Sequence, residues 1–124
     1  MLELLVCFLL GGGAYAGLEL SWRGSTHWSM FWVGGAGLCL LRQTSLCALP
    51  FALQAALGAA TLTLLELASG LVLNRLLGWQ VWDYSHLPGN LWGQVCPQYF
   101  LCWLALSAGC IAFFRWMDAK SPPL

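Results

Sequence analysis

Residues 46–73 read LCALPFALQAALGAATLTLLELASGLVL, and a single charged side chain, Glu66, interrupts this apolar run. A helix rises about 1.5 Å per residue, so about 20 apolar residues are enough to cross the hydrocarbon layer of a bilayer. Pro50 lies near the start of the run, where the missing N–H of proline leaves no helical hydrogen bond unmade. The stretch therefore predicts a membrane-spanning helix.

The composition of the whole chain also favours a membrane protein. Of the 124 residues, 60% are hydrophobic and 8% are charged, and the mean hydropathy is +0.73. Soluble domains are about 25% charged, so five basic and five acidic residues are too few to cover a surface exposed to water. This charge deficit argues against a soluble protein. Because the formal net charge is zero, we expect no nucleic acid partner.

Three further apolar runs predict an all-α polytopic membrane protein, a bundle of about four transmembrane helices within a single domain. The expected spans are residues 2–20, 27–41, 46–73 and 91–114 of the domain 1–124. The second span is short for a full crossing and could be tilted or re-entrant. An aromatic-rich interfacial loop, 74–90, precedes the fourth span, and a short polar tail, 115–124, follows it.

Glycine and proline add local expectations to this outline. Gly13 and Gly17 form a GxxxG pair in the first span, which permits the close approach of another helix. Pro97 lies inside the expected fourth span, where it predicts a kink or an irregular first turn. Arg42–Ser45 is expected to form a polar turn between the second and third spans.

Polar residues recur on one face of the third span. Thr63, Glu66, Gly70 and Asn74 follow one another at i, i+3, i+7 and i+11, which places them on one side of an α-helix. One interpretation is the lining of a solute or ion path, because a carboxylate is costly within a membrane unless it has a function. The other is a set of interhelical hydrogen bonds that fix helix packing.

Two groups near the ends of the first and second spans have similar alternatives. Glu19 could be functional, could reach the headgroup region, or could pair with Arg23 four residues later. His27 and Ser29 open the second span. A histidine at this position could transfer a proton, or it could be a polar residue at the start of a helix at the membrane interface.

The densest polar cluster lies between the third and fourth spans. Asp83 is expected to accept hydrogen bonds from nearby backbone N–H groups in a turn, and Tyr84 follows it. Asn90 has the chemistry of a helix N-cap, which would place Gln94 one turn into the fourth span. The cluster predicts either a capped interfacial loop or an irregular segment that lines a cavity, the setting in which irregular backbone persists at membrane depth.

Neither a metal site nor an enzyme motif emerges from the pattern. The six cysteines lie mostly in apolar runs and form no CxxC pair, which favours packing residues over zinc ligands or disulfides. His27 and His86 are far apart, and no HxxxH box, nucleophile elbow or phosphate-binding loop is present. We therefore expect no catalytic residue, no metal and no cofactor, and an intramembrane lipid-modifying enzyme is the weakest of three functional hypotheses.

Several segments, in chain order, resemble one family. They are Gly17-Leu-Glu19, His27-Trp-Ser-Met-Phe31, Thr61-Leu-Thr63 with Glu66, Gly70 and Asn74, Trp82-Asp-Tyr-Ser85, Pro88-Gly-Asn-Leu91 and Gly93-Gln-Val-Cys-Pro97. In these segments the chain resembles the type IV ABC-transporter permeases with a CmpB-like domain. The resemblance implies a small multi-pass protein of the bacterial plasma membrane. The chain has no ATP-binding motif of its own, so any coupling to ATP would need a separate subunit.

The leading hypothesis is a small membrane transporter or channel for a small solute or ion, with an intramembrane acidic site. In this hypothesis Glu66 binds a cation or a proton, and four residues of the polar cluster shape a gate. The candidate binding residues are Glu19, His27, Ser29, Thr63, Glu66, Asn74, Asp83, Tyr84, Asn90 and Gln94. The alternative is a structural or regulatory membrane subunit that uses the same polar face to dock a partner.

Topology and assembly follow less directly from the sequence. Four helices enclose little space, so besides the lipid bilayer we expect a homo-oligomer, most simply a dimer, as the partner. Arg42, Arg115 and Lys120 lie on one side of four crossings, and Arg23 and Arg75 lie on the other. Such a small imbalance weakly favours cytoplasmic termini and permits an antiparallel dimer.

Overall fold

The computed structural model describes residues 2–24 and 27–120, apart from the side chains of residues 22 and 23. The helices are α1 (Leu2–Arg23), α2 (Trp28–Ser45), α3 (Phe51–Gly70), the π-helix η1 (Leu71–Leu76) and α4 (Pro97–Lys120). Loops join them, and one isolated β-bridge pairs Leu91 with Val95. The prediction of an all-α fold is confirmed.

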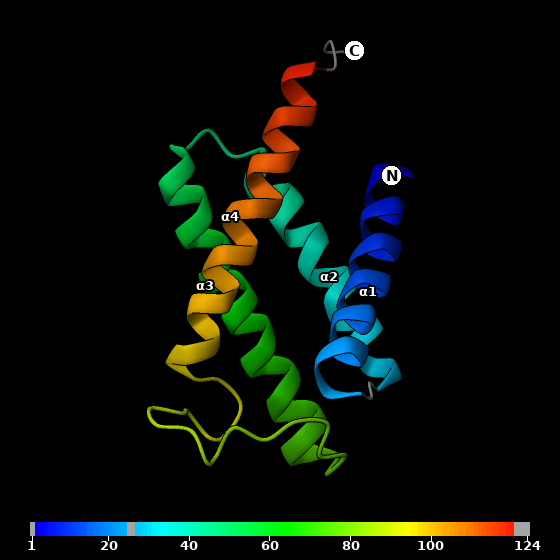
Figure 1. Ribbon diagram of the computed structural model, residues 1–124, viewed down its shortest axis with the longest axis vertical. Helices are drawn as coiled ribbons and strands as arrows, with labels where there is room; N and C mark the ends of the chain where they lie inside the picture. The colour runs from blue at the N-terminus through cyan, green and yellow to red at the C-terminus, as the bar shows by residue number, and fades with distance from the viewer. Residues whose placement is uncertain (1, 25–26, 121–124) are drawn as a thin grey trace.

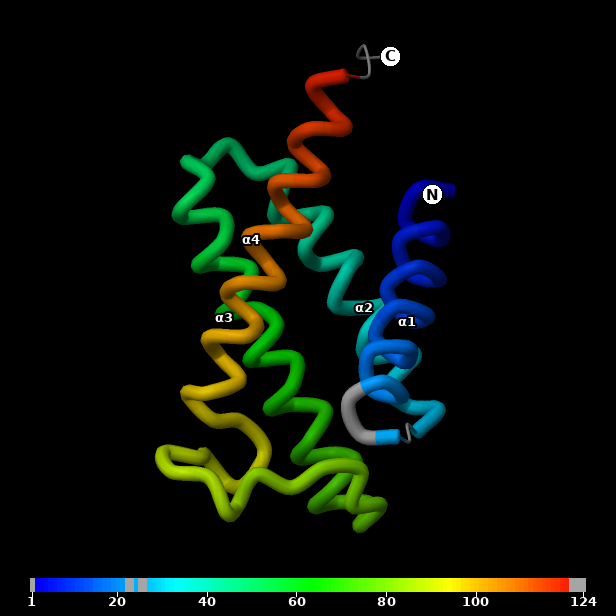
Figure 2. Tube along the Cα trace, viewed as in Figure 1, coloured from blue at the N-terminus to red at the C-terminus, as the bar shows by residue number. Residues whose placement is uncertain are grey.

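The helices form an antiparallel bundle in which both termini lie at the same end (Figure 1). α1 packs along α2, α2 also packs against α3 and α4, and α3 packs against α4. Figure 2 shows α2 between α1 on one side and the α3–α4 pair on the other. The backbone of α1 is therefore attached to the rest of the described bundle through α2.

The outer faces of the helices are suited to lipid. Leu2–Ser21, Phe51–Leu76 and Pro97–Lys120 are each long and apolar enough to cross a membrane. They expose large apolar side chains such as Leu64 and Leu101, both more than half exposed. Hydrocarbon tolerates such surfaces, and a helix pairs its own backbone polar groups. The chain is therefore a multi-pass membrane protein.

α2 is shorter than the other three α-helices and central to their packing. Its 18 residues give it a length of about 27 Å. It starts beside the end of α1. Near its own end, at the opposite end of the bundle, Arg42 bonds to Glu3 at the start of α1. α2 therefore runs the length of the bundle, and its course is not re-entrant.

The last turn of α2 occupies the residues expected to form a polar turn. The side chain of Gln54, which is buried, donates from Nε2 to the carbonyl oxygens of Thr44, Ser45 and Cys47 at 3.3, 3.1 and 2.9 Å. Carbonyl groups at a helix C-terminus have no partner inside the helix. The Gln54 amide supplies a hydrogen-bond partner for them. Because α2 continues to Ser45, the prediction of a turn at 42–45 is wrong, and the chain turns at 46–50 instead.

Glycines bring α1 and α2 into backbone contact. A Cβ atom added at Gly11 would lie 2.7 Å from the carbonyl oxygen of Gly34, and one added at Gly35 would lie 2.6 Å from the carbonyl oxygen of Phe8. No real Cβ atom fits at such distances. The two helices can pack this closely only because these positions lack side chains.

Gly13 and Gly17 take no part in this contact. A Cβ atom at either position would meet nothing within 4 Å in the described structure. The GxxxG pair therefore mediates no close approach within the described chain, because the face of α1 that meets α2 is the one bearing Gly11 and Gly12.

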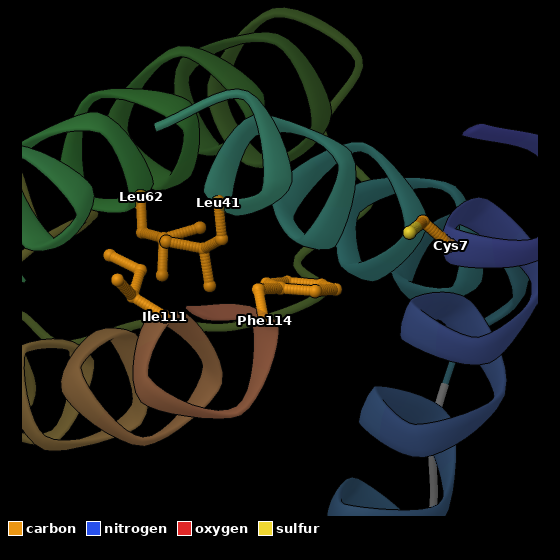
Figure 3. Close-up of a cluster of buried hydrophobic side chains, with 5 residues drawn as sticks. All are labelled: Cys7, Leu41, Leu62, Ile111 and Phe114. Atoms are coloured by element: carbon orange, nitrogen blue, oxygen red, sulfur yellow. The ribbon is translucent and has the colours of Figure 1, made fainter. Parts of the chain in front are cut away.

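The apolar core lies between α2, α3 and α4 (Figure 3). Leu41, Leu62, Ile111 and Phe114 are buried and point toward one another, and Ile111 is fully enclosed. Cys7 of α1 lies apart from these four, close to α2. The three later helices thus share a core, whereas α1 is held mainly by its contact with α2.

A charged cluster joins three helices at the end that carries the termini. Arg42 is buried, donates from Nε to Glu3, and donates from Nη1 and Nη2 to the two carboxylate oxygens of Asp118, both at 2.8 Å. A buried guanidinium is stable only when its charge is matched and its N–H groups are bonded. The sequence did not reveal this cluster, because Glu3 and Asp118 lie far from Arg42 along the chain.

The bounds of α4 differ from the expected 91–114. Trp92 and Gly93 have φ angles of +54° and +72°, which interrupt a right-handed helix. Pro97 begins the helix instead of kinking it. The N–H group that proline lacks would have no partner in the first turn of a helix, so the proline costs no hydrogen bond there. The helix continues to Lys120 through most of the expected tail, held there by the Arg42–Asp118 pair. Residues 121–124 of that tail lie outside the described part.

The α1–α2 contact generates a prediction about stability. Replacing Gly35 with Ala should lower the free energy of unfolding by about 1–3 kcal/mol, because the new methyl group overlaps the Phe8 carbonyl and separates the helices. Denaturant unfolding of the purified protein in detergent measures the change. In the matched control, Gly109→Ala, where an added Cβ atom also meets nothing within 4 Å, should leave stability unchanged or raise it by up to about 1 kcal/mol. Equal losses in both variants would contradict the packing described.

Candidate functional site

Glu66 is the buried carboxylate at the centre of the candidate site. The residue is 6% exposed and lies on α3. Its Oε2 accepts a hydrogen bond of 2.9 Å from the Tyr84 hydroxyl, and its Oε1 accepts one of 3.1 Å from the Trp103 indole N–H. Both donors are neutral, and no lysine, arginine or histidine of the described chain forms an ion pair with this carboxylate. Hydrogen bonds therefore stabilise the charge of Glu66 without neutralising it.

Glu66 faces a cavity of about 170 Å³ between the helices. All four α-helices and Trp82 of the following loop contribute to its wall. Most lining side chains are apolar. Three of the wall residues are aromatic, Trp82, Trp103 and Tyr15, and the ring centroids of the last two are 6.0 Å apart. We call this space the inner cavity. It combines one acidic group with an apolar and aromatic wall.

A larger and more polar groove of about 640 Å³ adjoins the inner cavity. The two spaces share five wall residues, which are Tyr15, Leu18, Trp82, Trp103 and Leu106. The groove also contains the acidic residues Glu19 and Asp83 together with His86. We call it the outer groove. Three candidate carboxylates thus lie along two adjoining spaces, with Glu66 in the inner one.

Tyr84 lines the outer groove and bonds to the acid of the inner cavity. Its ring lines the outer groove and stacks on Tyr99 at 4.8 Å between centroids, while its hydroxyl reaches Glu66. Burial, and next the adjacent carboxylate, raise the pKa of the Tyr84 phenol well above its usual value. The hydroxyl therefore remains a hydrogen-bond donor at physiological pH.

The loop that carries Tyr84 is fixed by two side-chain amides. Asn74 Oδ1 accepts from the backbone N–H groups of Val81 and Trp82 at 2.6 and 3.3 Å, and its Nδ2 donates to Gln94 Oε1 at 2.8 Å. Gln94 returns a bond to the loop by donating to the Trp92 carbonyl at 2.9 Å. Asn74 and Gln94 therefore hold the loop against η1, and they do not line either space.

Gly70 makes room for this arrangement. A side chain at Gly70 would overlap Gln94 and the Trp82 ring. The predicted face bearing Glu66, Gly70 and Asn74 is real, but it faces the loop as well as the cavity. The π-helical turn at Leu71–Leu76, which contains Asn74, was not predicted; such turns are rare and occur often at functional sites.

The rest of the loop is held in place by hydrogen bonds between its own residues. Asn90 donates to the carbonyls of Ser85 and Leu87 and accepts from the Gly93 N–H at 2.9 Å. It is not the N-cap of α4, because that helix begins seven residues later. Asp83 is exposed and accepts from the Ser85 backbone N–H, which lowers the pKa of its carboxyl. The expected turn chemistry of Asp83 is confirmed.

Three other predicted residues lie away from the inner cavity. His27 caps α2, with its Nδ1 3.2 Å from the Ser29 backbone nitrogen and 2.6 Å from the Ser29 hydroxyl. Neither residue lines the two spaces. The Thr63 hydroxyl is buried with no hydrogen-bond partner among the described residues. The proposed pairing of Glu19 with Arg23 involves a side chain outside the described part.

Aromatic side chains complete the site, and the sequence analysis missed them. Trp103 donates to Glu66 from the middle of α4, while Tyr15 and Tyr99 shape the walls. The signal was a tryptophan deep inside an apolar span: a buried indole N–H usually needs an acceptor. Glu66, in the neighbouring span, is such an acceptor.

Residues 19–120 match the sequence model of the family ABC_trans_CmpB, described as "Putative ABC-transporter type IV". The chain belongs to this family. No curated protein and no solved structure matches it. For this CmpB-family protein, the family and the membrane-spanning helices together support a transport-related role.

The family match covers most of the CmpB-family site. It includes Glu19, Glu66, the loop and all of α4, while Tyr15 precedes its first residue. The described residues contain no group of three or more histidine, cysteine or acidic side chains that could hold a metal ion. The functional groups at the site are therefore a carboxylate, neutral hydrogen-bond donors and aromatic rings.

The loop contacts of this CmpB-family protein generate a second prediction. Replacing Asn74 with Ala removes the acceptor for two backbone N–H groups and should destabilise the loop locally by about 1–3 kcal/mol. Hydrogen exchange at the Val81 and Trp82 amides should accelerate accordingly. Thr63→Val, which removes an unpartnered hydroxyl, should leave both amides and the stability within about 0.5 kcal/mol of wild type. Unchanged exchange in Asn74→Ala would contradict the assigned contacts.

Proposed function

We propose that this protein moves a small solute or ion across the membrane and that Glu66 is the intramembrane group that binds it. Support comes from the position of Glu66, buried on a membrane-spanning helix and facing a cavity. A carboxylate at membrane depth is costly and is retained mainly where it has a function. Two neutral hydrogen bonds orient it, yet leave its charge to be balanced by a proton or a bound cation.

The adjoining spaces suggest a route to this group. A cation would enter the outer groove, where Glu19 and Asp83 provide negative charge. It would then pass the shared aromatic wall to reach Glu66. Tyr84 lies between the two spaces and bonds directly to Glu66. Rotation of this phenol, with the loop held by Asn74 and Gln94, would open or close the passage.

Assembly of two or more copies would complete the transporter. Among the described helices the backbone of α1 contacts only α2, and Gly13 and Gly17 of α1 have open space around them. Helices approach closely at such positions in membranes. We propose a homodimer in a bacterial plasma membrane, whose coupling to ATP, if present, comes from another subunit.

The outward glycines also suit the alternative function, a structural or regulatory subunit. In that case the bare face of α1 would dock a helix of another membrane protein, and the chain alone would carry no flux. Co-purification of a stable membrane partner would favour this alternative.

The transport proposal predicts a loss of flux when the acid is removed. The purified protein in lipid vesicles should conduct at least one of three probes: protons, sodium or tetraethylammonium. Glu66→Gln keeps the size of the side chain and removes its charge, so flux should fall by about tenfold or more, as expected when an interaction of at least about 1.4 kcal/mol is lost.

The control for this experiment is Glu3→Gln. Glu3 lies at the other end of the bundle with its side chain 60% exposed, and in Glu3→Gln the amide oxygen can still accept from Arg42 while Asp118 balances the charge of the guanidinium. Flux through the Glu3→Gln variant should equal flux through the wild-type protein. Flux that persists in Glu66→Gln, or no flux of any probe by the wild-type protein, would contradict the proposal.

A further inference from the structure

The wall of the inner cavity restricts what can bind there. Among the described side chains that line it, only Glu66 and Tyr15 carry oxygen atoms. Hard inorganic cations such as Ca²⁺ and Mg²⁺ require about six or more oxygen ligands, and the protein supplies too few. The remaining wall is made of leucine, valine, methionine, alanine, cysteine and tryptophan side chains and of glycines. A small inorganic ion would lose its hydration shell here and gain little in return.

The same wall is well suited to a charge carried on an apolar body. The rings of Tyr15, Trp82 and Trp103 line the same cavity as the Glu66 carboxylate, and the centroids of the Tyr15 and Trp103 rings are 6.0 Å apart. Aromatic faces attract ammonium groups within about 6 Å of the ring centroid, most strongly where water is excluded. The acid and the rings therefore favour the same ligand charge, while the leucines favour apolar substituents.

The volume of the cavity limits the size of the ligand. An apolar cavity of about 150 Å³ binds benzene, and the inner cavity has about 170 Å³. A ligand of roughly one ring with small substituents would fill it. Long acyl chains and extended dyes exceed this volume.

We infer that the inner cavity binds a compact organic ammonium ion with apolar substituents, held by the Glu66 carboxylate and the rings of Tyr15, Trp82 and Trp103. This inference rests on the proposed function, for which it names the class of substrate. The outer groove, with Glu19 and Asp83, is its entrance.

The test compares a cation with its uncharged carbon analogue. Benzyltrimethylammonium and neopentylbenzene have nearly the same shape and differ in charge. Binding to the purified protein in detergent is followed by the fluorescence of the tryptophans, with empty micelles as the blank. Benzyltrimethylammonium should bind to wild type and to the control Glu3→Gln, and it should bind to Glu66→Gln at least about tenfold more weakly. Neopentylbenzene should bind to wild type and Glu66→Gln equally.

A second variant tests the cavity itself without altering its charge. Val33 lines the inner cavity, and Val33→Phe should fill part of it and weaken binding of benzyltrimethylammonium while Glu66 remains. Equal binding of the cation to wild type and to both variants would overturn the inference, as would competition by sodium at concentrations equal to those of the organic cation.

Failure of this inference can be told from failure of the transport proposal. Proton or sodium flux that depends on Glu66, combined with no binding of benzyltrimethylammonium, would retain the transport proposal and overturn the organic cation. Binding that depends on Glu66, without flux of any probe, would retain the inferred ligand class and overturn transport.

Discussion

The site depends on one constraint, the placement of a carboxylate among apolar membrane helices. Glu66 can remain buried because Tyr84 and Trp103 donate to its two oxygens. One donor comes from α4 and the other from the loop before it, so satisfying this acid requires α3, α4 and the loop to meet at one point. The amides of Asn74 and Gln94 then fix the loop where Tyr84 can reach. The inner cavity, which is lined by aromatic rings, lies next to Glu66 in this arrangement.

Buried charges are stabilised differently at the two ends of the bundle. At the end with the termini, Arg42 is matched by Glu3 and Asp118, so the charges hold α1, α2 and α4 together. Around Glu66, the groups of the described residues that bond the acid are both neutral. A matched cluster is complete without a ligand, whereas an acid with neutral partners keeps the capacity to take a proton or a cation. This contrast supports the binding role that we propose for Glu66, and it gives Arg42 a structural role.

The sequence was sufficient for the membrane assignment and the all-α class, because composition and run length determine both. It also identified Glu66 and the polar cluster after α3. It did not predict the partners of Glu66, since Tyr84 and Trp103 become its neighbours only when the loop folds back. Pattern alone placed Asn90 and Gln94 at the start of a helix, and the positive φ angles of Trp92 and Gly93 delay that helix to Pro97. Likewise, spacing singled out Gly13 and Gly17, whereas the contact with α2 depends on which face of α1 turns inward.

The central claim is that Glu66 faces a space that a ligand can enter. Chemical labelling tests it directly. Diisopropylcarbodiimide is a compact, apolar reagent that modifies carboxyl groups in apolar surroundings, and peptide mass spectrometry locates the adduct. We predict that Glu66 reacts fastest of the acidic residues and that benzyltrimethylammonium slows its reaction. An unmodified Glu66 under conditions that label Glu3 or Asp118 would contradict the account.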